Sequence, residues 1–194
     1  MAGAHSNPHP HADVLTQSLH PNRRHAGKGF PVSDSIPNAA TDQALKILAD
    51  GSEVPATDPR TDHVAVLFPD GWMVACRPLT DTDGESLPNA DAVDAAAAAL
   101  DLLGHNDWQT APLDEVWLRH ILKHDRYDPA LDSNLFPNLA RGDWYWTGTN
   151  TPWSKDTASS SASSAFGVFL GLGHVGSVPR YLSGFGLACR RARQ

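Results

Sequence analysis

The 194-residue sequence has few cysteines, no long apolar run and no excess of basic charge. Its two cysteines, Cys76 and Cys189, are too few for a disulfide scaffold or a four-cysteine zinc site. No stretch approaches the roughly 18 apolar residues of a membrane-spanning helix, and Met1–His20 lacks the apolar region of a secretory signal. The net charge of −7 argues against nucleic-acid binding and against electrostatic attachment to an anionic membrane.

The composition is that of a globular protein with one substantial core. Hydrophobic residues make up 41% of the chain and charged residues 19%. The 15 glycines and 15 prolines exceed average usage, which favours a fold rich in loops. Composition alone therefore predicts a soluble domain but no function.

Residues 1–62 differ from the rest of the chain. Phe30 is their only aromatic residue, and prolines recur throughout, so this segment cannot bury enough apolar surface to offset the entropy of ordering it. We predict a short amphipathic helix over Thr41–Ala49 and an extended arm over the remainder, with another subunit of an assembly as its simplest partner. The arm's histidines (His5, His9, His11, His20 and His25) are irregularly spaced, which favours a solvated polar arm over a metal site.

Residues 63–194 carry the patterns of a folded domain. Val64–Phe68 and Trp72–Cys76 flank a Pro-Asp-Gly turn and predict a hairpin. Asn89 predicts the cap of a helix over Ala90–Leu103, and a second helix is expected from Pro112 to His124. Further strands are expected over Trp144–Thr149, Ala165–Leu170, Gly173–Pro179 and Gly186–Arg191.

Seven short blocks in this domain stand in an order that matches a known family. They are Gly104-His105-Asn106-Asp107-Trp108, Pro112 with Glu115-Val116, Asp128-Pro129-Ala130-Leu131-Asp132 with Leu135-Phe136-Pro137-Asn138, Trp144-Tyr145-Trp146-Thr147, Ala165-Phe166-Gly167-Val168-Phe169, Gly173-His174-Val175 and Leu187-Ala188-Cys189-Arg190-Arg191. Together they resemble the Lcl C-terminal domain family of phage and bacterial surface proteins. The resemblance implies an α+β, C-type-lectin-like domain over 63–194, in which two helices pack on short antiparallel sheets after the arm.

The sequence departs from the family pattern in two blocks. Trp108-Gln109-Thr110-Ala111-Pro112 carries an insertion, and Tyr145-Trp146-Thr147-Gly148 replaces a serine pair, so no ligand common to the family is carried over. The resemblance implies that the first and last strands lie side by side, as in other C-type-lectin-like folds. This arrangement would bring Cys76 and Cys189 within bridging distance of each other. From the residues alone they are two buried small hydrophobes or one disulfide, and both alternatives stay open.

Catalytic and metal-binding patterns are weak. His120 and His124 share a face of the expected second helix, but the glutamate of a zinc-protease motif is missing between them. Asp125, Asp128 and Asp132 form an acidic turn after this helix, and the turn lacks the central glycine of a calcium-binding loop. The serine run Ser159–Ser164 has neither a nucleophile elbow nor an adjacent base. We therefore expect no enzyme, no metal site and no cofactor.

A binding surface is the remaining prediction. Trp108, Trp146 and Phe136 are expected in the core with Cys76 and Cys189 as structural residues. Trp153 lies in a long loop and, with Asn150, Lys155 and Asp156, is the candidate ligand site. The alternative is that Trp153 folds back and plugs the loop.

The combined expectation is a non-enzymatic component of a bacteriophage virion, such as a tail, fibre or capsid-decoration protein. It would be made in the host cytoplasm and form a homo-oligomer through residues 1–62. Its lectin-like head would bind a host-surface glycan or protein, or a neighbouring subunit. Two alternatives are a bacterial adhesin-like glycan-binding module at the cell surface and an intracellular inhibitor of a host protein.

Overall fold

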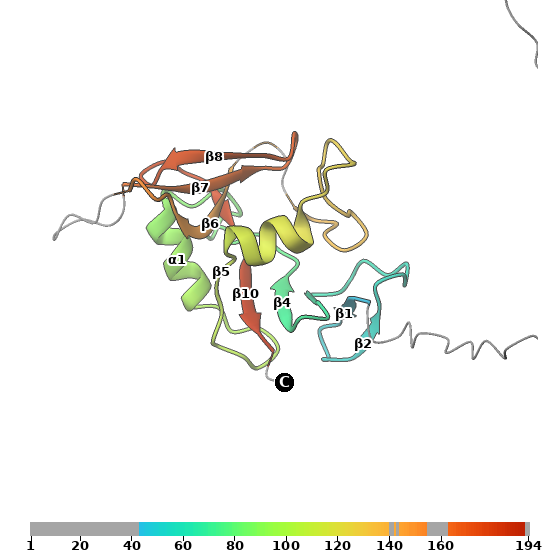
Figure 1. Ribbon diagram of the computed structural model, residues 1–194. Helices are drawn as coiled ribbons and strands as arrows, with labels where there is room; N and C mark the ends of the chain where they lie inside the picture. The colour runs from blue at the N-terminus through green and yellow to red at the C-terminus, as the bar shows by residue number, and fades with distance from the viewer. Residues whose placement is uncertain (1–42, 140–141, 143, 155–162, 193–194) are drawn as a thin grey trace, which may run out of the picture. The chain divides into compact units, whose positions relative to one another are not determined.

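The computed structural model describes residues 43–139, 142, 144–154 and 163–192, which form an α+β fold of two sheets and two short helices (Figure 1). The expected α+β class with antiparallel sheets is thus confirmed. Residues 1–42, most of the expected arm, lie outside the described part.

The larger sheet has the strand order β2-β1-β3-β4-β10-β5, with every neighbouring pair antiparallel. Its strands are β1 (Leu45–Ile47), β2 (Glu53–Pro55), β3 (Ala65–Leu67), β4 (Trp72–Ala75), β5 (Gln109–Thr110) and β10 (Ala188–Arg191). The β3–β4 hairpin is confirmed, and its turn requires a glycine because Gly71 has a φ of 87°.

The smaller sheet has the order β8-β7-β6-β9, in which β6 pairs with β9 in parallel and the other pairs are antiparallel. Its strands are β6 (Trp144–Asn150), β7 (Ser164–Phe169), β8 (His174–Pro179) and β9 (Phe185–Gly186). Strands β6, β7 and β8 agree with the expected segments to within a residue. The single strand expected over Gly186–Arg191 is wrong, because the chain there divides into β9 in this sheet and β10 in the large sheet.

The expected helix over Thr41–Ala49 is wrong, because Leu45–Ile47 is a strand that pairs with both β2 and β3. Residues 43–62 are therefore part of the large sheet and its loops, and an arm that extends to residue 62 is wrong for them. The physical reason lies at Lys46, which is fully buried. The expected helix rested on the spacing of Ala44, Leu45 and Leu48, whereas the observed strand also buries Lys46.

Both expected helices are present but shorter. Helix α1 (Ala90–Ala98) begins at Asn89, whose side-chain oxygen accepts a hydrogen bond of 2.8 Å from the Ala92 amide. The second helix, η1 (Leu113–Ile121, yellow in Figure 1), is wound as a π-helix: the amide of Trp117 donates to the carbonyl of Pro112, five residues earlier. Its buried face is Leu113, Val116, Trp117 and Ile121.

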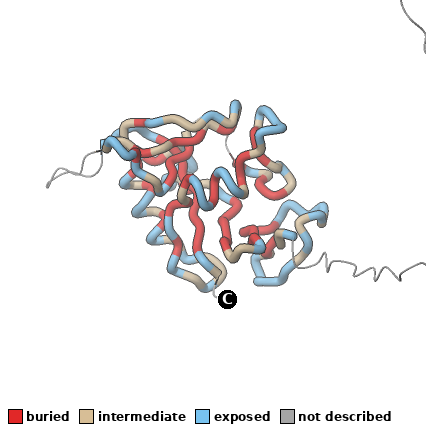
Figure 2. Tube along the Cα trace, viewed as in Figure 1, coloured by how far each residue is buried: buried red, intermediate tan, exposed pale blue. Residues whose placement is uncertain are grey.

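The sheets separate two apolar cores. Along β4, Trp72 and Val74 face the core that contains η1, whereas Met73 and Ala75 face the core that contains α1. Figure 2 shows the buried residues concentrated along the strands and the inner sides of the helices. None of the helices in the described residues is long and apolar enough to cross a membrane.

Candidate functional site

Three exposed apolar side chains gather in the loops at one end of the small sheet. Strand β6 ends, β7 begins and β8 ends there, so the loops over 151–163 and 180–184 leave the sheet at the same end. Trp153, Tyr181 and Leu182 in these loops are 63%, 76% and 42% exposed. We call these three residues the Trp153 surface.

Hydrogen bonds hold the chain around Trp153 in a defined conformation. The Ser154 amide donates to the carbonyl of Thr151 over 2.9 Å, and the Ser154 hydroxyl accepts from the Ser164 amide over 3.0 Å. The Trp153 ring meets Phe166 edge to face, with ring centroids 6.1 Å apart. Trp153 therefore rests against the sheet, and most of its surface faces solvent.

Asn150 is tied into an ionic network beside this surface. Its side-chain oxygen accepts a 3.0 Å hydrogen bond from Arg180, which also donates to Asp91 (2.6 Å) and Asp94 (2.7 Å) of α1. Burial tends to lower the pKa of Arg180, but the hydrogen bonds to these two carboxylates outweigh it and raise the pKa. Asn150 thus positions the end of β6, and its amide nitrogen is the group that can donate to a ligand.

The other candidate residues fall into two groups. Lys155 and Asp156 lie outside the described residues. Trp108, Trp146, Phe136, Cys76 and Cys189 are all buried, at 3% exposure or less.

The two cysteines are free. Strands β4 and β10 are neighbours, and Cys189 stands opposite Val74, two residues before Cys76. Both side chains belong to the same core, and the Cys76 thiol donates to the Leu135 carbonyl over 3.5 Å. Burial raises the pKa of each thiol to about 12, so neither is a reactive thiolate.

The histidines His120 and His124, which the sequence suggested as a pair, have different surroundings. His120 Nε2 lies 2.9 Å from Asp70 Oδ2, and the imidazole stacks on Phe68 with centroids 4.2 Å apart. This pairing fastens η1 to the β3–β4 turn. His124 lies in a turn beyond Ile121, where η1 ends, so the expectation that the two histidines share a helix face is wrong. The residues that the structure describes contain no group of three metal-ligating side chains.

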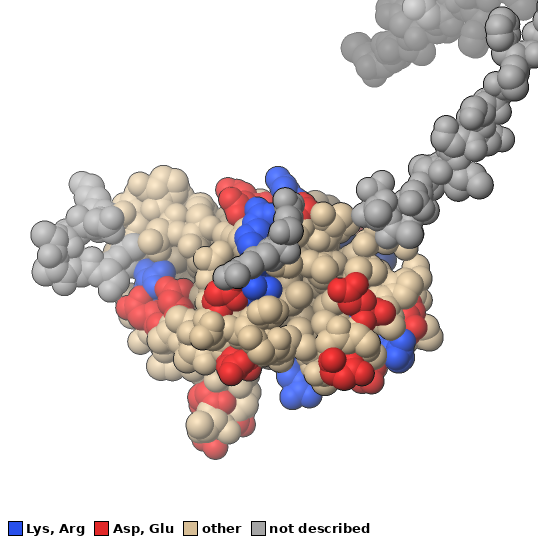
Figure 3. Space-filling view, turned by 90° about the horizontal axis from the view of Figure 1, so that it is seen from below, with Lys and Arg blue, Asp and Glu red and all other residues tan. Residues whose placement is uncertain are grey.

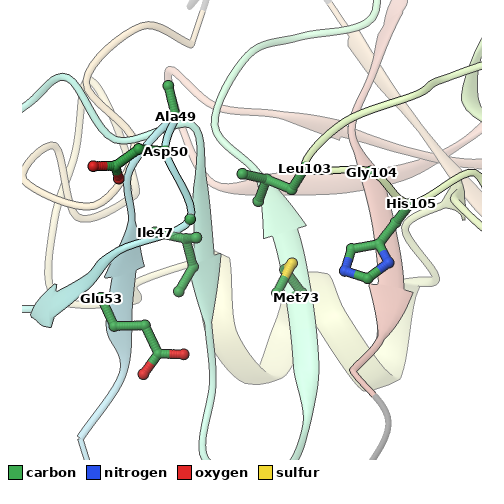
Figure 4. Close-up of a pocket in the computed structure, with 9 residues that line it drawn as sticks. Ile47, Ala49, Asp50, Glu53, Met73, Leu103, Gly104 and His105 are labelled. Atoms are coloured by element: carbon green, nitrogen blue, oxygen red, sulfur yellow. The ribbon is translucent and has the colours of Figure 1, made fainter.

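Sequence reasoning missed a groove on the large sheet. A hollow of about 550 Å³ (Figure 4) and a second one of about 580 Å³ share Glu53, Met73, Gly104 and His105 as lining residues, so they form one continuous depression. We call it the outer groove. Its residues are scattered from Ile47 to Ala192, and several come from the segment expected to be an arm, so no local pattern could have indicated it.

On the face seen in Figure 3, acidic and basic side chains are interspersed. Comparisons with protein-family models, with curated proteins and with solved structures find no match to this chain.

Proposed function

We propose that this chain is a non-enzymatic binding protein of a bacteriophage virion, a tail, fibre or decoration component with a C-type-lectin-like head. The ordered blocks of sequence support the lectin-like fold, as does the adjacency of β4 and β10. The observation that carries the binding function is the Trp153 surface, where a held indole is 63% exposed. Its ligand is a host-surface glycan or protein, or a neighbouring subunit.

Trp153 offers a ligand a large apolar contact area. An indole has a large rigid apolar face and loses little conformational entropy on binding, which is why tryptophan is enriched among binding hot spots. The hydrogen bonds of Thr151, Ser154 and Ser164 already fix the chain on both sides of the ring. Ligand binding therefore does not have to order this segment first.

The experiment is a glycan array probed with the full-length protein and two variants, Trp153→Ala and Tyr127→Ala. Tyr127 is the matched control because it is an aromatic residue 76% exposed at the opposite end of the small sheet, next to the β7–β8 turn. Trp153→Ala is expected to weaken binding by roughly tenfold or more, and Tyr127→Ala by less than about twofold. Equal losses in both variants, or none in Trp153→Ala, would contradict the proposal.

Residues 1–42, the part of the expected arm that precedes the large sheet, enter the proposal as the segment that assembles copies of the chain. A homo-oligomeric virion component predicts that the full-length protein, of 20.8 kDa per chain, has a solution mass that is a multiple of this value. Light scattering measures that mass directly. A monodisperse monomer would argue against assembly through this segment and favour the adhesin-like or inhibitor alternatives.

A further inference from the structure

The outer groove crosses one face of the large sheet at right angles to the strands. Its lining includes Ile47 of β1, Glu53 of β2, Leu67 of β3, Met73 of β4 and Arg190 of β10. The loop at 103–107 forms the side of the groove opposite Glu53. No residue of α1 lines the groove. In Figure 4, Glu53 and His105 extend from opposite sides toward the space over Met73.

The dimensions suit a short piece of extended chain. From β2 to β10 the sheet is four strand spacings wide, about 19 Å at about 4.8 Å each. An extended chain advances about 3.3 Å per residue, so about six residues span the groove. Small-molecule sites instead enclose most of the ligand surface in a compact cavity.

The charges along the groove favour a cationic occupant. Asp50, Glu53 and Asp107 line it, and all three are exposed. The one cation among the lining residues, Arg190, is 4% exposed and engaged with Asp107 by hydrogen bonds of 2.6 and 3.1 Å. Hydrogen bonds from the Ser52 hydroxyl and amide lower the pKa of Asp50 and keep it ionised. Asp50 and Glu53 therefore have no cationic partner among the lining residues, and the charge of Arg60, outside the groove, also lowers the pKa of Asp50.

The loop on the side of the groove opposite Glu53 contains a tight turn over residues 102–105. The Leu102 and His105 amides each donate to the other's carbonyl over 3.1 Å, and Leu103 and Gly104 between them have φ angles of 58° and 72°. A leucine rarely adopts such a left-handed conformation. The turn places Leu103 and His105 at the rim of the groove.

We propose that the outer groove binds a short extended segment of a protein partner that carries arginine or lysine side chains. The cationic groups lie against Asp50 and Glu53, and their aliphatic stems lie on Met73 and Leu67. This site is separate from the Trp153 surface, which belongs to the other sheet, and it does not depend on the function proposed for that surface.

The test uses the full-length protein and a fluorescein-labelled peptide, Arg-Leu-Arg-Leu-Arg-Gly, followed by fluorescence anisotropy at low and physiological salt. The peptide is expected to bind saturably, with an affinity that falls as salt screens the carboxylates. Its counterpart with glutamate in place of arginine is expected not to bind. Failure of the arginine peptide to saturate below about 1 mM, or equal binding of the glutamate peptide, would overturn the proposal.

Two charge-neutral variants separate the groove from the general acidity of the protein. Glu53→Gln is expected to raise the Kd of the arginine peptide about tenfold, whereas Glu85→Gln, the same change outside the groove, is expected to raise it less than twofold. Equal effects of the two variants would overturn the proposal. Trp153→Ala is expected to leave the peptide Kd unchanged, so failure of either binding proposal can be recognised without the other.

Discussion

At the scale of single residues, Lys46 shows how one buried charge organises the chain around it. Its ammonium donates to the carbonyls of Asp58 (2.6 Å) and Arg60 (2.7 Å) and to the side-chain oxygen of Asn134 (2.9 Å). An ammonium has three hydrogens, so every donor is satisfied although the residue is fully buried. The loop after β2 and the segment around Asn134 are thereby joined to β1.

Replacing this lysine is expected to cost more than its apolar packing suggests. Lys46→Met keeps the aliphatic stem but leaves two carbonyls and the Asn134 oxygen without their donor, and we expect a loss of about 3 kcal/mol in the free energy of unfolding. Urea denaturation measures the change. Lys123→Met, a lysine change outside this cluster, is the control and is expected to stay within about 0.5 kcal/mol. A similar small effect at Lys46 would show that the buried hydrogen bonds contribute little.

The His120–Asp70 pair makes stability depend on pH. Burial lowers the pKa of His120 below its ordinary 6.5, against the opposing effect of the hydrogen bond and charge of Asp70, while Arg119 and Lys123 act in the same direction as burial. The unfolded chain therefore binds a proton at His120 more readily than the folded chain. The contribution of His120 to stability is therefore fully present above about pH 6.5, and it is lost as the pH falls from there through the lower pKa of the folded state.

We expect the free energy of unfolding to fall less steeply between pH 7.5 and 5.5 in His120→Gln than in the native protein. One group contributes at most about 1.4 kcal/mol per pH unit. Asp70 stays ionised between pH 5.5 and 7.5 and does not add a titration of its own. Burial raises the pKa of Asp70, but the hydrogen bonds with His120 and Arg119 outweigh burial and lower this pKa. Parallel pH profiles of the two proteins, measured by urea unfolding, would refute this assignment.

At the scale of elements, α1 approaches the strands closely because glycine stands where it crosses them. A Cβ atom placed on Gly186 of β9 would overlap the Val93 side chain of α1. The carbonyl of Gly186 also accepts a 2.8 Å hydrogen bond from the Leu79 amide, so the strand cannot easily move away. Helix and strand are therefore fitted to each other at this point.

Gly186→Ala is expected to reduce the free energy of unfolding by about 2 kcal/mol, since the added methyl group overfills a packed core. Adding Val93→Ala should relieve part of this cost, so the double variant is expected to be more stable than the sum of the two single changes predicts. Urea unfolding of the four proteins completes the cycle. Gly142→Ala, where a Cβ would meet nothing within 4 Å, is the neutral control.

The elements also show which features a single sequence can predict. The β3–β4 hairpin and α1 were predictable because a turn motif and a capping asparagine lie next to their apolar patterns. Strand β1 was not, because burial of Lys46 depends on Asn134, 88 residues away. The position of Trp153 in a loop was predictable, whereas the engagement of Asn150 with Arg180 depends on α1 and could not be inferred locally.

At the scale of the whole described region, the large sheet is the element to which every other part is joined. Its faces contribute to both apolar cores, with Ala188 of β10 on one side and Cys189 on the other. The β1–β2 hairpin extends this sheet beyond β3 and supplies Ile47, 3% exposed, to the core of α1. The folded region therefore includes this hairpin.

A protein starting at residue 43 keeps both strands of the β1–β2 hairpin and is expected to unfold cooperatively with the same urea midpoint as the full chain. One starting at residue 63 loses β1 and the Lys46 hydrogen bonds, and β3 becomes an unprotected edge beside an uncovered core. It is expected to aggregate or to show no cooperative transition. If the protein that starts at residue 63 instead unfolds at the same midpoint as the full chain, the β1–β2 hairpin and the Lys46 hydrogen bonds add nothing to the stability of the fold.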